Sequence, residues 1–259
     1  MNRDENIRFI NSKLEDSVRE VVSAANLLGD GMEFYAVNDY LIQSLFLKLT
    51  GAQEQKMKCI CWELATDNLS YRYKRYYEKW SLSQCSSYYD KTVVYEDIIK
   101  NIKRHDPNYA LFTDPSGNDK KLVLNHILDV MNNIFLNTNI ERIHRKKYNE
   151  FVSVWNNIIP ACLAPTTKWL FKNGNREAPL EGLKRDEELY AIYFLLYNYR
   201  NRYAHNATSY QLNLPRFYEI NDDIYQTFNN VFIFIAELIL IDDIFRTLFS
   251  AYKASIQLD

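Results

Sequence analysis

Apolar residues recur at helical spacing along most of the chain and predict a series of helices. Over residues 4–28, one face of the predicted helix carries Ile7, Ile10, Leu14, Val18, Val21, Val22 and Ala25. Similar patterns predict helices over residues 33–65, 92–103, 120–136, 140–158, 183–205 and 216–252. The segments 81–89 and 164–179 lack the pattern and are expected to be irregular. We therefore expect an all-α fold in one domain, with an irregular, extended middle region.

The most apolar stretch runs from Val231 to Ile241. Its apolar positions surround the predicted helix instead of forming one stripe, so this helix is either the central core helix or a contact between subunits. The stretch contains Glu237 and is shorter than the ~20 residues that cross a bilayer. Because the N-terminal residues also lack the apolar core of a signal peptide, we expect a cytoplasmic protein with no membrane contact.

Composition agrees with a soluble helical protein. The chain has 259 residues, of which 47% are hydrophobic and 25% charged, and only six Gly and six Pro. This scarcity of turn-forming residues favours long helices over a many-stranded sheet. The net charge is −2 and the pI about 6.1, so the overall basic footprint of a nucleic-acid binder is absent. Any site for a polyanion must therefore be local.

Most sequence patterns that carry chemistry are absent. The chain has no glycine-rich phosphate loop, no HExxH, no GxSxG and no paired CxxC. Asp242 and Asp243 are adjacent and point about 100° apart on a helix; with Arg246 one turn later they predict a solvated or salt-bridged strip. No metal or cofactor is expected. We interpret the remaining candidates as buried thiols and isolated histidines: Cys59, Cys61, Cys85, Cys162, His105, His126 and His144.

The predicted helix over 183–205 is apolar at first and ends in a polar string, YRNRYAHN, from Tyr199 to Asn206. Histidine exchanges a proton near neutral pH, which RNA cleavage without a metal requires. An arginine holds the charge that develops on phosphate oxygens through two parallel N–H bonds. Asn201 lies four residues before His205, on the same helix face, and Arg200 lies about 140° round from His205 with a long side chain.

The residues R200-N201-R202-Y203-A204-H205 resemble the R-x4–6-H motif of the HEPN superfamily of all-helical ribonucleases. The resemblance implies a metal-independent endoribonuclease that leaves 5′-hydroxyl and 2′,3′-cyclic phosphate ends. It implies that His205 is the acid/base, that Arg200 stabilises the transition state and that Asn201 orients the imidazole. It also implies a homodimer whose two motifs face each other and form a composite site on RNA.

The same resemblance implies a HEPN-like helical bundle over residues 1–259. Its core helices would lie at about 4–65 and 183–252, with 66–182 as an elaboration of helices and loops. A toxin, or an effector of prokaryotic defence or stress response, is the expected biological role, with an antitoxin or an activating protein as a partner. Some members carry a Tyr two residues after the His, where a paired nucleotidyltransferase modifies it. Here that position is Ala207, which argues against such a partner.

The position of the motif at the end of a helix also has an explanation that involves no catalysis. Arg200, Arg202 and His205 would oppose the negative end of the helix dipole, and Asn206 would be the C-cap. Arg202 has two interpretations, a second phosphate contact or a solvent-facing side chain. Both interpretations of the motif remain open.

Glu54 is a supporting candidate, because related proteins often carry an acidic residue in an early helix that packs near the site. The alternative, which the spacing slightly favours, is an exposed Glu54–Lys58 pair at i,i+4 that stabilises the helix by a few tenths of a kcal/mol.

Two basic segments, 72–79 and 142–147, are the best candidates for a path for RNA. In the first, tyrosines alternate with Arg and Lys, a composition suited to stacking on unpaired bases while neutralising phosphates. The alternative, which involves no ligand, is a solvated helix face with half-buried tyrosines. The candidate RNA-binding residues are Arg202, Arg72, Lys74, Arg75, Arg145, Lys146 and Lys147.

Two other functional classes compete with the ribonuclease. One is a non-catalytic helical module of the same fold that binds RNA, nucleotide or a protein. The other is a structural interaction protein whose contact is the helix over 231–241.

Overall fold

The structure is a computed structural model that describes residues 3–28, 31, 34–78, 85–111, 118–157, 188–205 and 228–257. Within these ranges the secondary structure is helical, with no strand, so the all-α prediction is confirmed for this part of the chain. Several predicted features lie outside it: the irregular segment 164–179, residues 81–84, 183–187 and 216–227, Cys162, Asn206 and Ala207.

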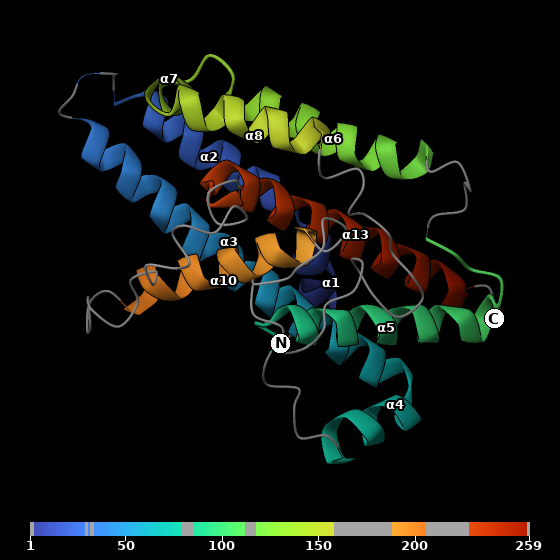
Figure 1. Ribbon diagram of the computed structural model, residues 1–259. Helices are drawn as coiled ribbons and strands as arrows, with labels where there is room; N and C mark the ends of the chain where they lie inside the picture. Colours follow the sequence, from blue (N-terminus) through green and yellow to red (C-terminus); the bar gives the residue numbers. More distant parts are fainter. Residues whose placement is uncertain are drawn as a thin grey trace.

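Figure 1 shows the helices of the described ranges. In order they are α1 (Arg3–Asn11), α2 (Leu14–Asn26), α3 (Tyr35–Asp67), α4 (Leu69–Tyr73), the π-helical turn η2 (Lys74–Glu78), α5 (Tyr88–His105), α6 (Asn118–Phe135), α7 (Asn139–Ile143), α8 (Arg145–Asn157), α10 (Glu188–His205) and α13 (Val231–Gln257).

Helix α13 is the element that the others surround. Every residue from Phe232 to Asp242 is buried, and α13 packs against α2, α3, α5, α6, α8 and α10. Figure 1 shows α6 and α8 along one side of α13 and α5 along the other. This confirms the interpretation of α13 as the central core helix. Each large apolar side chain that it buries stabilises the fold by about 1.5–3 kcal/mol.

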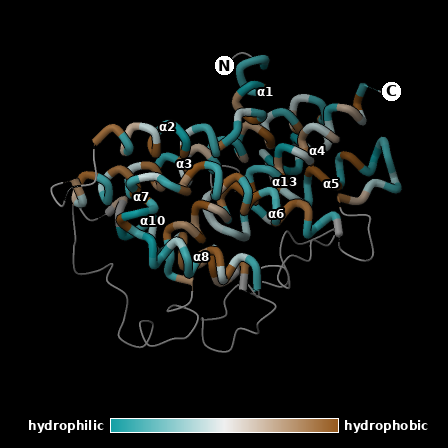
Figure 2. The backbone as a smooth tube through the Cα atoms, turned by 90° about the horizontal axis from the view of Figure 1, so that it is seen from above, coloured by the Kyte–Doolittle hydropathy of each residue, from teal (hydrophilic) through white to brown (hydrophobic). Residues whose placement is uncertain are grey.

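The outer helices are amphipathic. Figure 2 shows hydrophilic and hydrophobic residues alternating along them. The predicted elaboration over 66–182 contributes to the same core, because α5, α6 and α8 pack directly on α13. In α5 the buried stripe is Tyr88, Lys91, Tyr95, Ile98 and Ile102, at the spacing of one helix face.

The prediction of one helix over 4–28 is wrong, because the chain breaks at Ser12 and Lys13 between α1 and α2. A buried ion pair fills this break: Lys56 Nζ of α3 lies 2.7 Å from Asp242 Oδ1 of α13. The same amino group donates to the Ser12 carbonyl, and the Leu14 N–H donates to Asp242 Oδ2 at 3.2 Å. The break is therefore stabilised by side chains distant in sequence.

Asp242 also pairs with Arg246 at 3.5 Å, as the sequence suggested, but its carboxylate is buried and not solvated. Burial lowers the pKa of Lys56 and raises the pKa of Asp242, and their mutual attraction opposes both shifts. Burying these two charges therefore costs free energy, and removing either partner leaves the other charge buried without its counter-ion.

Three other predicted boundaries were wrong for local reasons. Helix α5 begins at Tyr88, not at 92, because Ser87 and Asp90 form a reciprocal capping box. The predicted helix over 140–158 is two helices, α7 and α8, separated at His144. The predicted helix over 216–252 is interrupted at 229–230, where the Asn230 side chain accepts from the Phe232 N–H at 3.0 Å and α13 begins.

The buried pair gives the first prediction. Lys56→Ala leaves Asp242 buried without its partner and should lower the free energy of unfolding by about 3–5 kcal/mol, measured by urea denaturation. Lys48→Ala, which removes the exposed Lys48–Glu20 contact of 3.6 Å, should cost at most about 1 kcal/mol. The double variant Lys56→Met/Asp242→Leu should recover most of the loss. Equal effects of the two single substitutions would contradict this account.

Candidate functional site

Helix α10 carries the polar motif from the core to the surface. Its first half is buried against α3, α5 and α13 through Leu189, Ala191, Ile192, Tyr193, Leu195 and Leu196. From Tyr197 to Arg202 the side chains are half-buried. Without any Gly or Pro, the helix therefore presents its polar residues at the edge of the bundle, as the sequence indicated.

Aromatic packing fixes this edge. The Tyr199 ring lies 5.1 Å from Phe46 of α3 and 5.5 Å from Phe234 of α13, between ring centres. Arg202 lies over the same tyrosine, with 5.8 Å between its guanidinium carbon and the ring centre. The start of α10 is held as well, since the Tyr193 hydroxyl donates to the Ser86 carbonyl at 2.8 Å. Contacts with α3, with α13 and with Ser86, just before α5, thus anchor α10.

Arg200 contacts Glu54 of α3, a residue 146 positions earlier in the chain. Arg200 Nη2 and Glu54 Oε2 are 3.5 Å apart, and the two side chains are 28% and 20% exposed. The other carboxylate oxygen, Oε1, accepts from Lys58 Nζ at 2.9 Å. Both interpretations of Glu54 therefore describe real contacts, one with Lys58 and one with the motif arginine. Glu54 is half-buried and not fully exposed.

The neighbour of Glu54 joins α3 to α13. Gln53 is buried and its Nε2 donates to the Leu238 carbonyl of α13 at 3.1 Å. This bond lies next to Glu54, which contacts Arg200 of α10. Arg200 also has the Tyr197 ring 6.0 Å away, between the guanidinium carbon and the ring centre. The position of Arg200 is thus defined from two sides.

The structure brings together Arg200 and Glu54, and it places Asn201 half-buried on the same helix. His205 is the last residue of α10, and its side chain lies outside the described part of the chain. The catalytic roles of Arg200, Asn201 and His205 therefore stay predictions.

Lys91 lies buried beneath this edge and was not found from the sequence. Its Nζ donates to the carbonyls of Cys85 and Ser86, at 3.0 and 3.1 Å, and lies 5.0 Å from the Tyr193 ring centre. Burial lowers the pKa of Lys91 to about 8, opposed by the Glu54 carboxylate and reinforced by Arg200. Lys91 belongs to the buried stripe of α5 described above. Its helical spacing from the apolar residues of that stripe was therefore the signal in the sequence that pointed to its burial.

Glu237 of α13 is fully buried near the same lysine. Among the described residues, neither of its carboxylate oxygens has a hydrogen-bond partner. Burial raises the pKa of Glu237 well above its usual range, and Lys91 only partly opposes the shift. Its position within the apolar run 231–241 was visible in the sequence.

The predicted RNA-binding residues differ in their exposure and in their ion-pair partners. Arg72 and Lys74 are exposed, whereas Arg75 is buried and pairs with Asp97 at 3.3 Å. In the second segment, Arg145 pairs with Glu141 at 3.2 Å and Lys146 lies 4.0 Å from Glu150, each at i,i+4. Lys147 is exposed as well. The second segment therefore has the features of a solvated helix face.

The isolated histidines and the described cysteines lie in positions that a structural role explains. His126 lies 3.5 Å from Asp243, and the His144 ring lies between Tyr35 and Phe232, at 5.6 and 6.4 Å between ring centres. His105 ends α5 at the surface. The expectation of buried free thiols is confirmed for Cys59, Cys61 and Cys85.

The described residues contain no cluster of three or more His, Cys, Asp or Glu side chains placed to bind a metal ion. No helix in these ranges has both the length and the apolar character needed to cross a membrane.

Comparisons of the chain with protein-family models, with curated proteins and with solved structures find no match. The HEPN resemblance therefore rests on the six-residue motif and on a helical architecture that many proteins share.

The buried carboxyl of Glu237 gives the second prediction. In the unfolded chain Glu237 ionises near its usual pKa of 4.5, whereas in the fold burial raises its pKa. The contribution of Glu237 to stability should therefore fall as pH rises above 4.5, by up to about 1.4 kcal/mol per pH unit. Glu237→Gln removes this loss, so its advantage over wild type should grow with pH.

Urea denaturation at several pH values between about 5 and 7 measures that difference. Glu20→Gln, which changes an exposed carboxylate, is the matched control and should show a small, pH-independent effect. A constant difference between Glu237→Gln and wild type across this range would contradict a raised pKa.

Proposed function

We propose that this protein is a metal-independent endoribonuclease whose site lies at the C-terminal end of α10. The observation that carries the proposal is the contact between Arg200 and Glu54 at a half-buried edge. A motif arginine that merely capped a helix would need no acidic partner from a distant helix. Here α3, α10 and α13 are packed so that the arginine is held in one place.

The surroundings of Arg200 suit it to bind a phosphate. A guanidinium has five N–H donors in a fixed plane, and the Glu54 contact occupies one of them. The side chain is 28% exposed, so the remaining donors are within reach of a ligand. Because the edge is only partly hydrated, an ion pair with a phosphate is stronger there than in bulk water.

The proposed reaction is an internal transesterification of RNA. The 2′-hydroxyl oxygen attacks the adjacent phosphorus, its proton passes to a base, and the bond from phosphorus to the 5′ oxygen breaks. The leaving 5′ oxygen takes up a proton, which gives a 5′-hydroxyl and a 2′,3′-cyclic phosphate. In this proposal His205 transfers the proton, Arg200 stabilises the charge on the non-bridging oxygens, and Asn201 orients the imidazole.

The proposal includes a homodimer, because one motif supplies a single Arg200–His205 pair. Two α10 edges that face each other would form a composite site with two of each residue. A toxin or an effector of prokaryotic defence or stress response, acting on RNA in the cytoplasm, is the corresponding biological role. An antitoxin or an activating protein would then control the activity.

The third prediction tests cleavage. Incubation of the full-length protein with single-stranded and structured RNA in EDTA should give cleavage products on a gel. His205→Ala and Arg200→Ala should each lower the rate by about a hundredfold or more, because proton transfer and charge stabilisation each contribute on that scale. His126→Ala and Arg19→Ala, at exposed positions away from α10, are the matched controls and should leave the rate unchanged.

Intact RNA with the wild-type protein would contradict the ribonuclease proposal. If such a protein still bound RNA, the non-catalytic module would be the better account. Cleavage that survives both His205→Ala and Arg200→Ala would show that the activity lies elsewhere.

The fourth prediction concerns the positioning role of Glu54. Glu54→Gln frees Arg200 and should lower kcat by roughly three- to tenfold, since half-exposed ion pairs contribute on the order of 1 kcal/mol. Lys58→Gln removes the other partner of Glu54 and should change kcat less than twofold. Equal effects of the two variants would show that Glu54 acts only through Lys58.

A further inference from the structure

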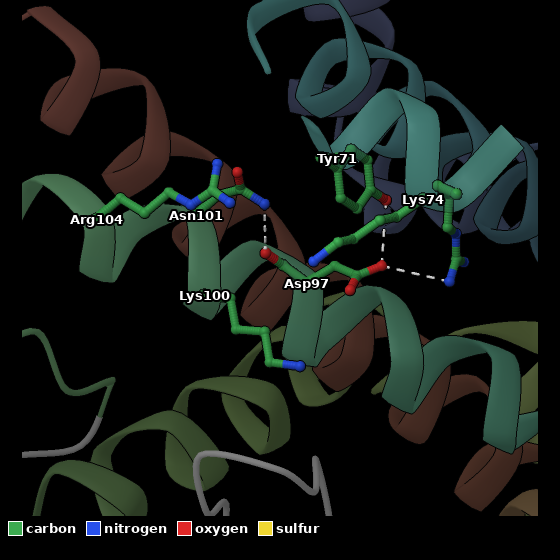
Figure 3. Close-up of a pocket in the computed structure, with 7 residues that line it drawn as sticks. Tyr71, Lys74, Asp97, Lys100, Asn101 and Arg104 are labelled. Carbon is green, nitrogen blue, oxygen red and sulfur yellow. Dashed lines mark hydrogen bonds and ion pairs between the residues drawn. The ribbon is translucent and has the colours of Figure 1, made fainter. Parts of the chain in front are cut away.

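A basic pocket lies between the segment α4–η2 and helix α5, and it is separate from the edge of α10. Its volume is about 290 Å³, at the low end of the ~300–1,000 Å³ usual for ligand sites. Figure 3 shows side chains from both segments facing one another across it. The lining residues are Tyr71, Lys74, Arg75, Asp97, Lys100, Asn101 and Arg104.

The spacing of these residues explains how the pocket forms. Positions 71, 74 and 75 lie on one face of the short helical segment, at i, i+3 and i+4. Positions 97, 100, 101 and 104 form one stripe of α5 at i, i+3, i+4 and i+7. Two polar stripes therefore face each other where apolar ones would normally pack. The segment 74–78 is a π-helix, a conformation frequent at functional sites.

The floor of the pocket is held by buried polar contacts. Arg75 is 6% exposed and lies 3.3 Å from Asp97 Oδ2, which also accepts from the Tyr71 hydroxyl at 3.1 Å. Asn101 Nδ2 donates to the Asp97 carbonyl at 2.8 Å, and the Asn68 side chain donates to Asn101 Oδ1 at 2.6 Å. Asp97 is thus already engaged by protein groups, and the floor is rigid.

At the mouth of the pocket, unlike at its floor, not every cationic side chain is paired with a carboxylate. Four cationic side chains and one carboxylate line the pocket. Lys100 pairs with Glu96 at 2.8 Å, on the exposed side of α5. Within the described ranges, Lys74 and Arg104 have no carboxylate at ion-pair distance. Figure 3 shows Lys74 extending from η2 toward α5, with Lys100 and Arg104 on the facing helix.

Such an arrangement suits an anion with more than one charge. In a protein of net charge −2, a local excess of cations requires a reason. A phosphate monoester carries about two negative charges at neutral pH and three acceptor oxygens. Lysine ammonium and arginine guanidinium groups are its usual ligands in proteins. A singly charged carboxylate would compensate only one of the two cations that are unpaired in the described ranges, Lys74 and Arg104.

Aromatic side chains lie on another face of the same segment, beside Trp62 of α3. Trp62 and Tyr76 line a neighbouring hollow together with Arg72 and Tyr77. Tyr73 and Tyr77 are stacked and largely exposed, with 5.5 Å between ring centres. Exposed aromatic faces beside cations are the combination that binds unpaired bases and their phosphates.

We propose that the pocket between α4–η2 and α5 binds the phosphate group of a nucleotide, either free or within an RNA strand. Lys74 and Arg104 contact the phosphate, and Arg75 contributes its charge from the floor. This binding site stands independently of the ribonuclease proposal, because none of its residues belongs to α10.

Isothermal titration calorimetry of the full chain at low ionic strength tests the proposal. The three probes are inorganic phosphate, adenosine monophosphate and a short single-stranded RNA with 2′-O-methyl groups, which cannot undergo transesterification. The variants are Lys74→Gln and Arg104→Gln, both at exposed positions, so circular dichroism should show an unchanged fold. Lys103→Gln is the matched control, because it removes the same charge from α5 at a position that does not line the pocket.

We expect saturable binding, weakened about fivefold or more by each pocket variant and less than twofold by Lys103→Gln. Binding of inorganic phosphate would indicate a site for the group alone. Binding of only the nucleotide or only the RNA, with the same dependence on Lys74 and Arg104, would support the site and identify the source of the phosphate.

Absence of saturable binding by all three probes would overturn the proposal. Equal losses in Lys74→Gln, Arg104→Gln and Lys103→Gln would also overturn it, since they would indicate general charge screening. None of the pocket residues belongs to α10, so loss of binding in Lys74→Gln and Arg104→Gln can be told apart from loss of RNA cleavage in Arg200→Ala.

Discussion

Burial of residues 232–242 of α13 on all sides is the constraint on which the rest of the structure depends. An apolar helix of this length cannot face water, so α2, α3, α5, α6, α8 and α10 must cover it. The polar residues within α13 then require partners inside the bundle. Asp242 pairs with Lys56 where the first two helices separate, whereas Glu237 has no hydrogen bond among the described residues and burial raises its pKa.

The same packing relates the two candidate sites. Helix α5 carries Lys91 beneath the α10 edge near its start and the stripe from Asp97 to Arg104 farther along. The 13 residues between Lys91 and Arg104 correspond to about 20 Å along a helix. One rigid element therefore spans from the edge that holds Arg200 to the basic pocket.

Much of the fold was predictable because helical periodicity is a local property of the sequence. The all-α class, the central role of 231–241 and most helices follow from it. The break at Ser12 was not predictable, because side chains more than 40 and 220 residues away stabilise it. At the site, Arg200 and Glu54 were both named, but only tertiary packing joins them. Lys91 was missed because a lysine on a buried stripe contradicts the usual preference for apolar residues.

The central claim is that the end of α10 cleaves RNA without a metal ion. Mass spectrometry of the RNA fragments produced in EDTA tests this claim most directly, because it identifies the bond that breaks and the oxygen that attacks. The account predicts fragments that end in a 2′,3′-cyclic phosphate and begin with a 5′-hydroxyl, and no such fragments from a parallel preparation of His205→Ala. Fragments that begin with a 5′-phosphate, or products that form only when a divalent metal is added, would contradict it.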